Sequence, residues 1–190
     1  AGRTIVTDMA GPAELADTLE KLDGLPIEYH LGGHEERDFG RDGADIIVVN
    51  PAVPPSSRFL GIARDAGHLL TSQMEIFFQL CPATIIGITG ANGKSTTTAL
   101  THHLLRAGNR RVWLGGNIGN QPLLTEVEDI ASADLVVLEL SSFQLEQLAR
   151  IQTGPKVALI TNITPNHLDR HGTFDAYCDA KENIFRCQPV

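Results

Sequence analysis

The segment Gly87–Thr96, with the sequence GITGANGKST, has the residues of a loop that binds phosphate groups. Glycines let backbone N–H groups approach phosphate oxygens, and a helix that follows adds the positive end of its dipole. A lysine and a hydroxyl at its end suit the β/γ-phosphates and Mg²⁺. The spacing is a shortened variant of the strict pattern, and the alternative is an ordinary glycine-rich turn. Because a strand precedes and a helix follows, we predict nucleotide binding by Gly90, Ala91, Asn92, Gly93, Lys94, Ser95 and Thr96.

Glu139 stands near the end of the apolar run Leu135–Leu140, which we expect to be a buried strand. An unpaired carboxylate buried there would be costly, so it needs a partner. In an open α/β sheet the carboxyl ends of the strands face the ligand crevice, which places Glu139 beside the phosphate loop. Its hard oxygen atoms suit Mg²⁺, although the side chain would also serve as a cap for the following helix.

Four other polar residues have roles that their local sequence leaves open. His167 follows the expected strand 156–161, and a lone histidine in a loop is usually solvated or structural. Lys181 lies in an expected helix, where a lysine is usually on the surface. Asn117 in GGNIG would either reach a ligand or stabilise its own turn. Ser141 starts an expected helix, so N-capping is its simplest role.

Four motifs occur in order along the chain: TGANGKST at 89–96, GGNIG at 115–119, LELSSFQLE at 138–146 and TNITPNHLDR at 161–170. Together they resemble the motifs of the Mur ligase family, which makes the peptide stem of peptidoglycan. The run LELSSFQ is similar in particular to the D-glutamate-adding member of that family. The motifs cover about residues 84–185, whereas residues 1–80 resemble the UDP-binding domain of that member only in layout.

The resemblance implies an ATP-dependent ligase that requires Mg²⁺, with two ions expected. Such an enzyme adds D-glutamate to UDP-N-acetylmuramoyl-L-alanine through an acyl phosphate. The implied catalytic residues are Lys94, Glu139, His167 and Lys181, and the implied metal ligands are Ser95, Glu139, His167 and Lys181. The family lysine that Lys181 matches is carbamylated by CO₂. That reaction needs the neutral amine, so burial or nearby cations must lower a pKa that starts at about 10.4.

The resemblance also implies contacts with the substrate. Ser141 and Gln144 would bind the muramoyl-alanine part, Asn117 would contact the substrate through its amide, and Asp8, a carboxylate at a strand end, would contact uridine. The alternatives are another Mur-type ligase or a folylpolyglutamate-type ligase. From a different class, a non-catalytic P-loop nucleotide-binding module remains open, although it leaves the implied catalytic residues unexplained as a set.

Short β-branched runs alternate with helical patterns along the whole chain, which predicts an α/β protein with mainly parallel sheets. We expect a truncated Rossmann-like, UDP-substrate-binding domain over 1–72 and the first part of a P-loop ATPase-like, ATP-binding domain over 73–190. Both ends look cut, so we expect a fragment that is inactive alone. Residues 45–50 are expected to form a strand buried on both faces, residues 35–38 a solvated loop, and Leu100, Leu104 and Leu105 part of the core.

The composition excludes several classes of protein. The 190 residues carry a net charge of −8, with a pI near 5.3, which is the wrong sign for a non-specific binder of nucleic acid or of a membrane surface. No apolar run approaches the roughly 20 residues that span a bilayer. Three cysteines without metal-like spacing argue against a disulfide framework. We therefore expect a cytoplasmic monomer that binds neither nucleic acid nor membranes.

Overall fold

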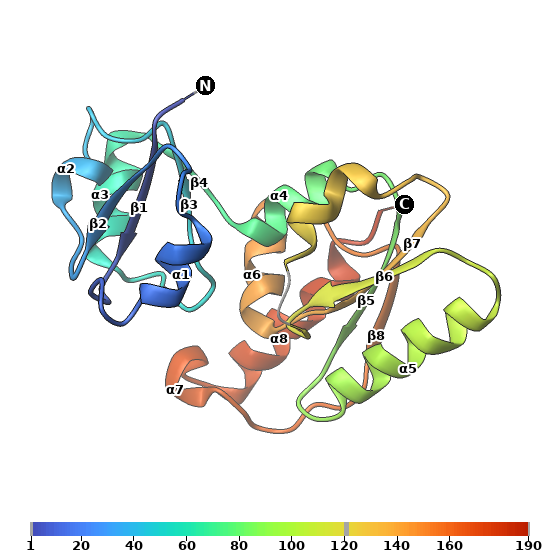
Figure 1. Cartoon of the computed structure of the whole chain (residues 1–190). Coiled ribbons are helices and arrows are strands. Elements are labelled where there is room, and N and C mark those ends of the chain that lie inside the picture. Colours follow the sequence, from blue (N-terminus) through green and yellow to red (C-terminus); the bar gives the residue numbers. More distant parts are fainter. Residues whose placement is uncertain (1, 120–121, 190) are drawn as a thin grey trace. The chain divides into compact units, whose positions relative to one another are not determined.

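The computed structural model describes residues 2–119 and 122–189 of the chain. Helices and parallel strands alternate along it (Figure 1), which confirms the predicted α/β class. The chain divides into two compact units. One unit combines Ala1–Ile47 with Pro55–Leu70, and the other combines Val48–Pro54 with Thr71–Val190.

The N-terminal elements form two small sheets with three short helices. They are β1 (Thr4–Asp8), α1 (Ala16–Lys21), β2 (Ile27–Leu31), α2 (Glu36–Phe39), β3 (Ile46–Val48), α3 (Arg58–Ala66) and β4 (Leu69–Thr71). Strand β1 pairs with β2 in parallel, and β3 pairs with β4. The helix α3 ends at Gly67, whose positive φ of 82° favours glycine at a helix C-terminus.

Two expectations for this region are wrong. Strand β3 is not buried on both faces, because Ile46 and Val48 are each 57% exposed. Among the described residues β3 pairs only with β4, so no central sheet surrounds it. The segment expected to be a solvated loop contains the helix α2 and the buried Asp38, whose Oδ2 lies 2.6 Å from Nδ1 of His30.

The other unit holds a four-stranded parallel sheet in the order β6-β7-β5-β8. Its elements are α4 (Gln73–Leu80), β5 (Thr84–Thr89), α5 (Lys94–Ala107), β6 (Val112–Gly116), the 3₁₀ helix η1 (Leu123–Asp129), β7 (Leu135–Glu139), α6 (Ser142–Arg150), β8 (Val157–Ile160), α7 (Leu168–His171) and α8 (Phe174–Arg186). Helix α5 contacts β6 and β7, whereas α6 and α8 pack together and α8 contacts β5 and β8. Figure 1 shows α5 and the pair α6–α8 on opposite sides of the sheet.

The core of this unit lies between the sheet and the helices α4, α6 and α8. It includes Phe77, Val136, Leu138, Leu148 and Ile184. The expectation that Leu100 and Leu104 belong to the core is wrong, because they are 55% and 61% exposed. Residues four apart share one face of a helix, and in α5 that face is directed to solvent while the buried Thr98 lies inward. Leu105 is half-buried.

Candidate functional site

The predicted motifs meet at one edge of the four-stranded sheet. Because all four strands are parallel, their carboxyl ends lie at the same edge. The phosphate loop follows β5, Asn117 follows β6, Glu139 is the last residue of β7, and the segment with His167 follows β8. The strand order places β5 between β7 and β8, so the phosphate loop is flanked by Glu139 on one side and by the segment with His167 on the other.

The loop between β5 and α5 has the backbone geometry that its glycines predict. Gly93 precedes α5 with a φ of 77°, and Gly90 has a φ of 149°. A Cβ at Gly90 would lie 2.0 Å from Oγ1 of Thr161, so only glycine fits. No side chain caps α5, which leaves N–H groups of its first turn for an anion. Nζ of Lys94 donates to the Ala91 carbonyl at 3.0 Å, within the same loop.

The loop is tied to the end of β8 by Thr161 and Asn162. Oδ1 of Asn162 accepts from the Asn92 N–H at 3.0 Å, and its Nδ2 donates to the Asn92 carbonyl at 2.8 Å. The Ala91 N–H donates to the Asn162 carbonyl at 2.9 Å, and Oγ1 of Thr161 donates to the Asn92 carbonyl at 2.7 Å. One asparagine therefore satisfies both backbone groups of Asn92, a role that the sequence motifs did not indicate.

Glu139 is buried, with 2% of its surface exposed, and lacks a full set of protein partners. Its Oε1 accepts from Nδ2 of Asn117 at 3.3 Å, whereas its Oε2 is buried without a hydrogen-bond partner among the described residues. The Asn117 N–H also donates to the Glu139 carbonyl at 2.8 Å. Gly116, with a φ of 86°, permits this approach, since a Cβ there would lie 2.1 Å from the same carbonyl oxygen. A buried carboxylate oxygen that no protein donor satisfies fits a ligand of a cation such as Mg²⁺.

Lys181 is not the surface lysine that its helix alone indicates. Only 2% of its surface is exposed, and its Nζ donates to Oγ1 of Thr89 at 3.2 Å and to the Gly90 carbonyl at 3.0 Å. The ring of Tyr177 lies 4.8 Å from Nζ. The pKa of Lys181 is lowered from 10.5 to about 8. Burial is the main cause and the charge of Lys94 adds to it, whereas the charge of Glu139 acts in the opposite direction. The direction is the one that reaction of the amine with CO₂ requires.

His167 is exposed and lies beside an aromatic cluster. Its backbone is left-handed, with a φ of 52°, and its ring centroid lies 5.2 Å from that of Phe143. The guanidinium of Arg170 lies 4.1 Å from the centre of the Phe143 ring. His171 stacks on Phe143 at 5.4 Å and meets Tyr177 edge-on at 5.4 Å. Phe143, His171 and Tyr177 thus form a continuous set of rings from His167 to the lysine at the phosphate loop.

His171 is a buried titratable residue that the motifs did not single out. Its Nε2 lies 3.0 Å from Oγ of Ser142, and its Nδ1 lies 3.4 Å from Oε1 of Glu146. Burial lowers the pKa of His171; Glu146 opposes this, while Arg170 and His167 add to it. In the sequence, His171 stands four residues after His167, which would place both on one face of a helix. This spacing does not reveal that the His171 side chain is buried.

Ser141 caps α6 as its local sequence predicts. The Gln144 N–H donates to Oγ of Ser141 at 3.2 Å, and the Ser141 N–H donates to Oε1 of Gln144 at 2.9 Å, which is a capping box. Gln144 also lines a cavity of about 280 Å³, together with Met74, Gly116 and Leu138. The capping box leaves the Nε2 donor of Gln144 for other contacts.

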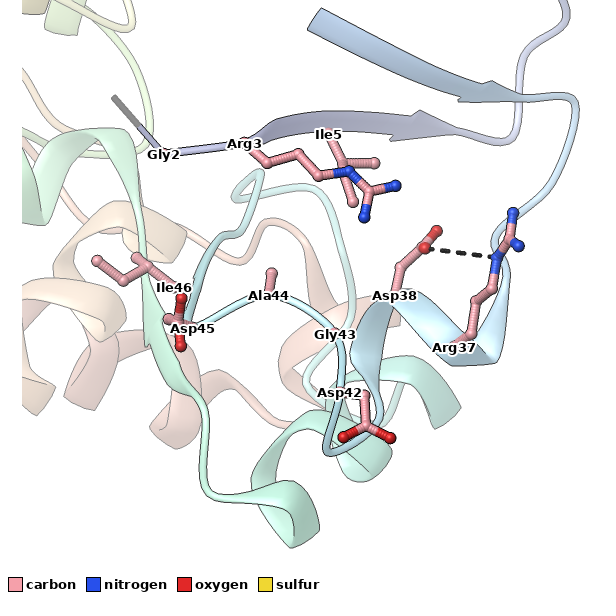
Figure 2. A pocket seen from close by; sticks show the side chains of 10 residues that line it. All are labelled: Gly2, Arg3, Ile5, Arg37, Asp38, Asp42, Gly43, Ala44, Asp45 and Ile46. Carbon is pink, nitrogen blue, oxygen red and sulfur yellow. Dashed lines mark ion pairs between the residues drawn. The ribbon is translucent and has the colours of Figure 1, made fainter.

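A larger cavity, of about 530 Å³, lies in the N-terminal unit and is lined by Arg3, Ile5, Asp38 and Ile46 among others. Figure 2 shows the guanidinium of Arg3 directed toward Asp38 on one side, with the side chain of Arg37 beyond it. Nε of Arg37 lies 4.0 Å from Oδ1 of Asp38.

Asp8, the residue implied to contact uridine, stands at the end of β1 and does not line this cavity. Its Oδ1 accepts from the Ala10 N–H at 2.8 Å and so stabilises the turn after β1.

Some features do not occur in the part of the chain that the structure describes. Residues 2–119 and 122–189 contain no group of three or more His, Cys, Asp or Glu side chains placed to hold a metal ion. The metal ligands that the family resemblance implies would not form such a group, because they include only one glutamate and one histidine, together with a serine and a modified lysine. None of the helices in these residues has the length and apolar character to cross a bilayer. The three cysteines are free thiols.

Comparison with known proteins identifies the family. Residues 88–189 match the Mur ligase middle domain, which is more than half of the chain. The chain belongs to the Mur ligase family. It is 50% identical over 183 residues to a UDP-N-acetylmuramoylalanine–D-glutamate ligase of Roseiflexus sp. (strain RS-1), covering 96% of this chain and 39% of that protein. A ligase of the same name from Geobacter metallireducens is 44% identical over 186 residues, with 98% and 40% covered.

The chain thus spans about two-fifths of the length of these relatives. Among solved structures, it is similar to UDP-N-acetylmuramate:L-alanyl-gamma-D-glutamyl-meso-diaminopimelate ligase from Neisseria meningitides, with a TM-score of 0.61 and 15% identity, covering 100% of this chain and 69% of that one. UDP-N-acetylmuramate-alanine ligase from Thermotoga maritima has a TM-score of 0.52 and 20% identity, with 98% and 47% covered. At these identities the likeness establishes the fold alone. The resemblance read from the sequence motifs is confirmed at the level of the family.

Proposed function

We propose that the chain is part of an ATP-dependent ligase that joins D-glutamate to UDP-N-acetylmuramoyl-L-alanine during peptidoglycan synthesis. The names of relatives 44–50% identical to it support this substrate pair. The observation that carries the proposal is the grouping of two buried, chemically unusual side chains at the phosphate loop. Glu139 has an unsatisfied carboxylate oxygen, and Lys181 has a lowered pKa and bonds to the loop itself. An acid that holds Mg²⁺ is common to P-loop proteins, but a simple nucleotide-binding module has no need of a buried lysine beside it.

The residues Gly90, Ala91, Asn92, Gly93, Lys94, Ser95 and Thr96 would bind the phosphates of ATP, with the first turn of α5 directing N–H groups at them. Ser95 and Glu139 would hold one Mg²⁺, and His167 and a carbamylated Lys181 would hold a second. When bound, the ions would offset the repulsion between the substrate carboxylate and the γ-phosphate. The cation of Lys94 would act in the same direction on the charge that develops in the transition state.

The substrate carboxylate would attack the γ-phosphorus of ATP, which breaks the bond to the bridging oxygen, releases ADP and forms an acyl phosphate. The amine of D-glutamate would then attack the acyl carbon, form the amide bond and displace phosphate. Ser141 and Gln144 would bind the muramoyl-alanine part, and Asn117 would also contact the substrate. Gln144 retains its Nε2 donor for this, whereas Asn117 also orients Glu139. Asp8 would contact uridine. Residues 1–72 would then belong to a UDP-substrate-binding domain, and residues 73–190 would form the first part of the ATP-binding domain.

The experiment that tests the proposal replaces the matching segment of the Roseiflexus relative with residues 1–190 of this chain. The chimera is expected to release phosphate from ATP only when UDP-N-acetylmuramoyl-L-alanine and D-glutamate are both present. Lys94→Ala in the same chimera should lower kcat by about 10²-fold or more, because it removes a cation from the reacting phosphates. Circular dichroism of both chimeras shows whether the segment has folded.

The alternatives give different results in this assay. A folded chimera that releases phosphate with L-alanine or a folate substrate, and not with D-glutamate, would make the chain part of a sister ligase. ATP binding without turnover under any combination of substrates, and unchanged by His167→Ala, would instead support a non-catalytic nucleotide-binding module. Residues 1–190 alone, without the rest of the relative, are expected to show no turnover.

A further inference from the structure

Thr89, the last residue of β5, is fully buried and joins three elements of the site. Its hydroxyl donates to the Leu140 carbonyl at 2.6 Å, just beyond β7. The same oxygen accepts from Nζ of Lys181, on α8, at 3.2 Å. The Gly90 carbonyl, the next residue along the chain, accepts from the same Nζ at 3.0 Å. The proposed ATP-binding and metal-binding residues do not include Thr89.

The two carbonyl groups, of Leu140 and Gly90, determine which groups donate and which accept in these hydrogen bonds. A carbonyl oxygen only accepts hydrogen bonds, so the single hydroxyl proton of Thr89 is committed to Leu140. The hydroxyl oxygen therefore offers only lone pairs to Lys181. The Gly90 carbonyl likewise accepts, so Nζ must direct one N–H bond at each of these two oxygens. In a neutral amine two N–H bonds held in this way also fix the direction of the remaining lone pair.

We infer that Thr89 is a positioning residue that orients the amine of Lys181 for reaction with CO₂. In that step the Nζ lone pair attacks the carbon of CO₂, and a C–N bond forms as one C–O π pair moves to oxygen. The nitrogen then gives a proton to water, which leaves an anionic carbamate. This inference rests on the proposed function, because the carbamate is the form in which Lys181 would bind a metal ion. Valine in place of threonine keeps the shape of the side chain but removes the oxygen that holds one N–H bond.

The test adds ¹³C-labelled bicarbonate, which is in equilibrium with CO₂, to residues 1–190 and measures the carbamate signal by ¹³C NMR at one fixed time before equilibrium is reached. The signal then reports the rate at which the carbamate forms. Lys181→Arg identifies the signal, because arginine does not form this carbamate. Thr89→Val should lower the signal about fivefold or more, as expected for the loss of one hydrogen bond to the amine. Thr89→Ser, which restores the hydroxyl, should keep it within about twofold of the wild type.

Thr98→Val is the matched control. Thr98 is also fully buried, but its hydroxyl donates to the Lys94 carbonyl at 2.8 Å within α5 and does not touch Lys181. This variant should keep the full signal, and circular dichroism should show that all variants are folded.

Several results would overturn the inference. One is a folded Thr89→Val protein that gives the same carbamate signal as the wild type. Another is a signal that is lost in Thr89→Ser but kept in Thr89→Val. The third is a wild-type protein that gives no signal dependent on Lys181. The ligase assay on the chimera is independent of this test. An inactive chimera with the expected carbamate pattern refutes the proposed function alone, whereas an active chimera without that pattern refutes only the role of Thr89.

Discussion

Replacing Lys181 with methionine tests whether the folded protein really holds a lysine that resists protonation. The pKa of Lys181 is lowered from 10.5 to about 8, and each pKa unit corresponds to 1.36 kcal/mol, so the charged form is disfavoured in the folded state by about 3 kcal/mol. Below pH 8 the amine is protonated in both states, and the folded state carries this whole penalty. Between pH 8 and 10.5 only the unfolded state binds the proton, so stability rises with pH. Above 10.5 the penalty is gone.

The measurement is the free energy of unfolding in urea, at intervals from pH 7 to 10.5, for the wild type and Lys181→Met. Buffers are kept free of CO₂ so that the amine stays unmodified. Bonds that the substitution removes, such as the one to Gly90, shift the two curves by an amount that varies little with pH. The difference, wild type minus variant, should therefore rise by about 3 kcal/mol across the window. Other groups that titrate here, such as Tyr177, are present in both proteins and cancel.

A difference that stays flat with pH would refute the reasoning, because it would mean that Lys181 has the same pKa folded and unfolded. A difference that falls as pH rises would refute it more strongly. It would show that the folded state favours the ammonium, in which case Glu139 outweighs burial and the charge of Lys94.

Two more predictions concern pH and backbone geometry. Hydrogen bonds to Asp38 and then Glu28 raise the pKa of His30, so its contribution to stability is full below pH 6.5 and is lost as pH rises through its folded-state value. Urea unfolding at pH 5.5 to 8.5 should show this fall, and His30→Gln should remove it. Gly116→Ala should lower stability by about 2 kcal/mol or more in thermal unfolding, because a Cβ meets the Glu139 carbonyl at 2.1 Å and φ is 86°.

Gly119→Ala is the matched control for Gly116→Ala. Gly119 also has a positive φ, of 78°, but a Cβ there meets no atom of the described residues within 4 Å. It should therefore lower stability by about 1 kcal/mol, which is the cost of the left-handed backbone alone. Equal losses at the two positions would contradict the prediction, because they would show that the backbone carbonyl of Glu139 can move to admit the Cβ.

The parts of the fold that local patterns specify were predictable from the sequence. Residues 84–89 and 94–107 form the strand and the helix that were predicted to precede and follow the phosphate loop. The parallel arrangement also followed from the alternation of strands and helices, and it placed Glu139 beside the phosphate loop. Once strands are parallel, residues at their carboxyl ends must meet, whatever their separation along the chain.

Burial was less predictable, because it depends on partners far away in the sequence. The apolar run containing Ile46 and Val48 has the composition of a central strand, yet its burial depends on neighbouring strands and not on its own residues. Lys181 is the opposite case, because it is buried although its local sequence indicates a surface residue. Its helix gives no sign of burial, and the hydroxyl that it contacts, on Thr89, is 92 positions away. No local pattern contains that information, and here the family resemblance indicated what the periodicity could not.

The link between Asn162 and the phosphate loop bears on how the parts of the site act together. The Asn162 side chain pairs with both the N–H and the carbonyl of Asn92, and Gly90 packs so closely on Thr161 that no side chain fits between them. The loop that would bind ATP and the segment that leads to His167 therefore have few independent movements near this contact. A phosphate group bound by the loop would thus be connected through Asn92 to Asn162, five residues before the histidine. Coupling of this kind requires a continuous physical connection, and these hydrogen bonds supply one.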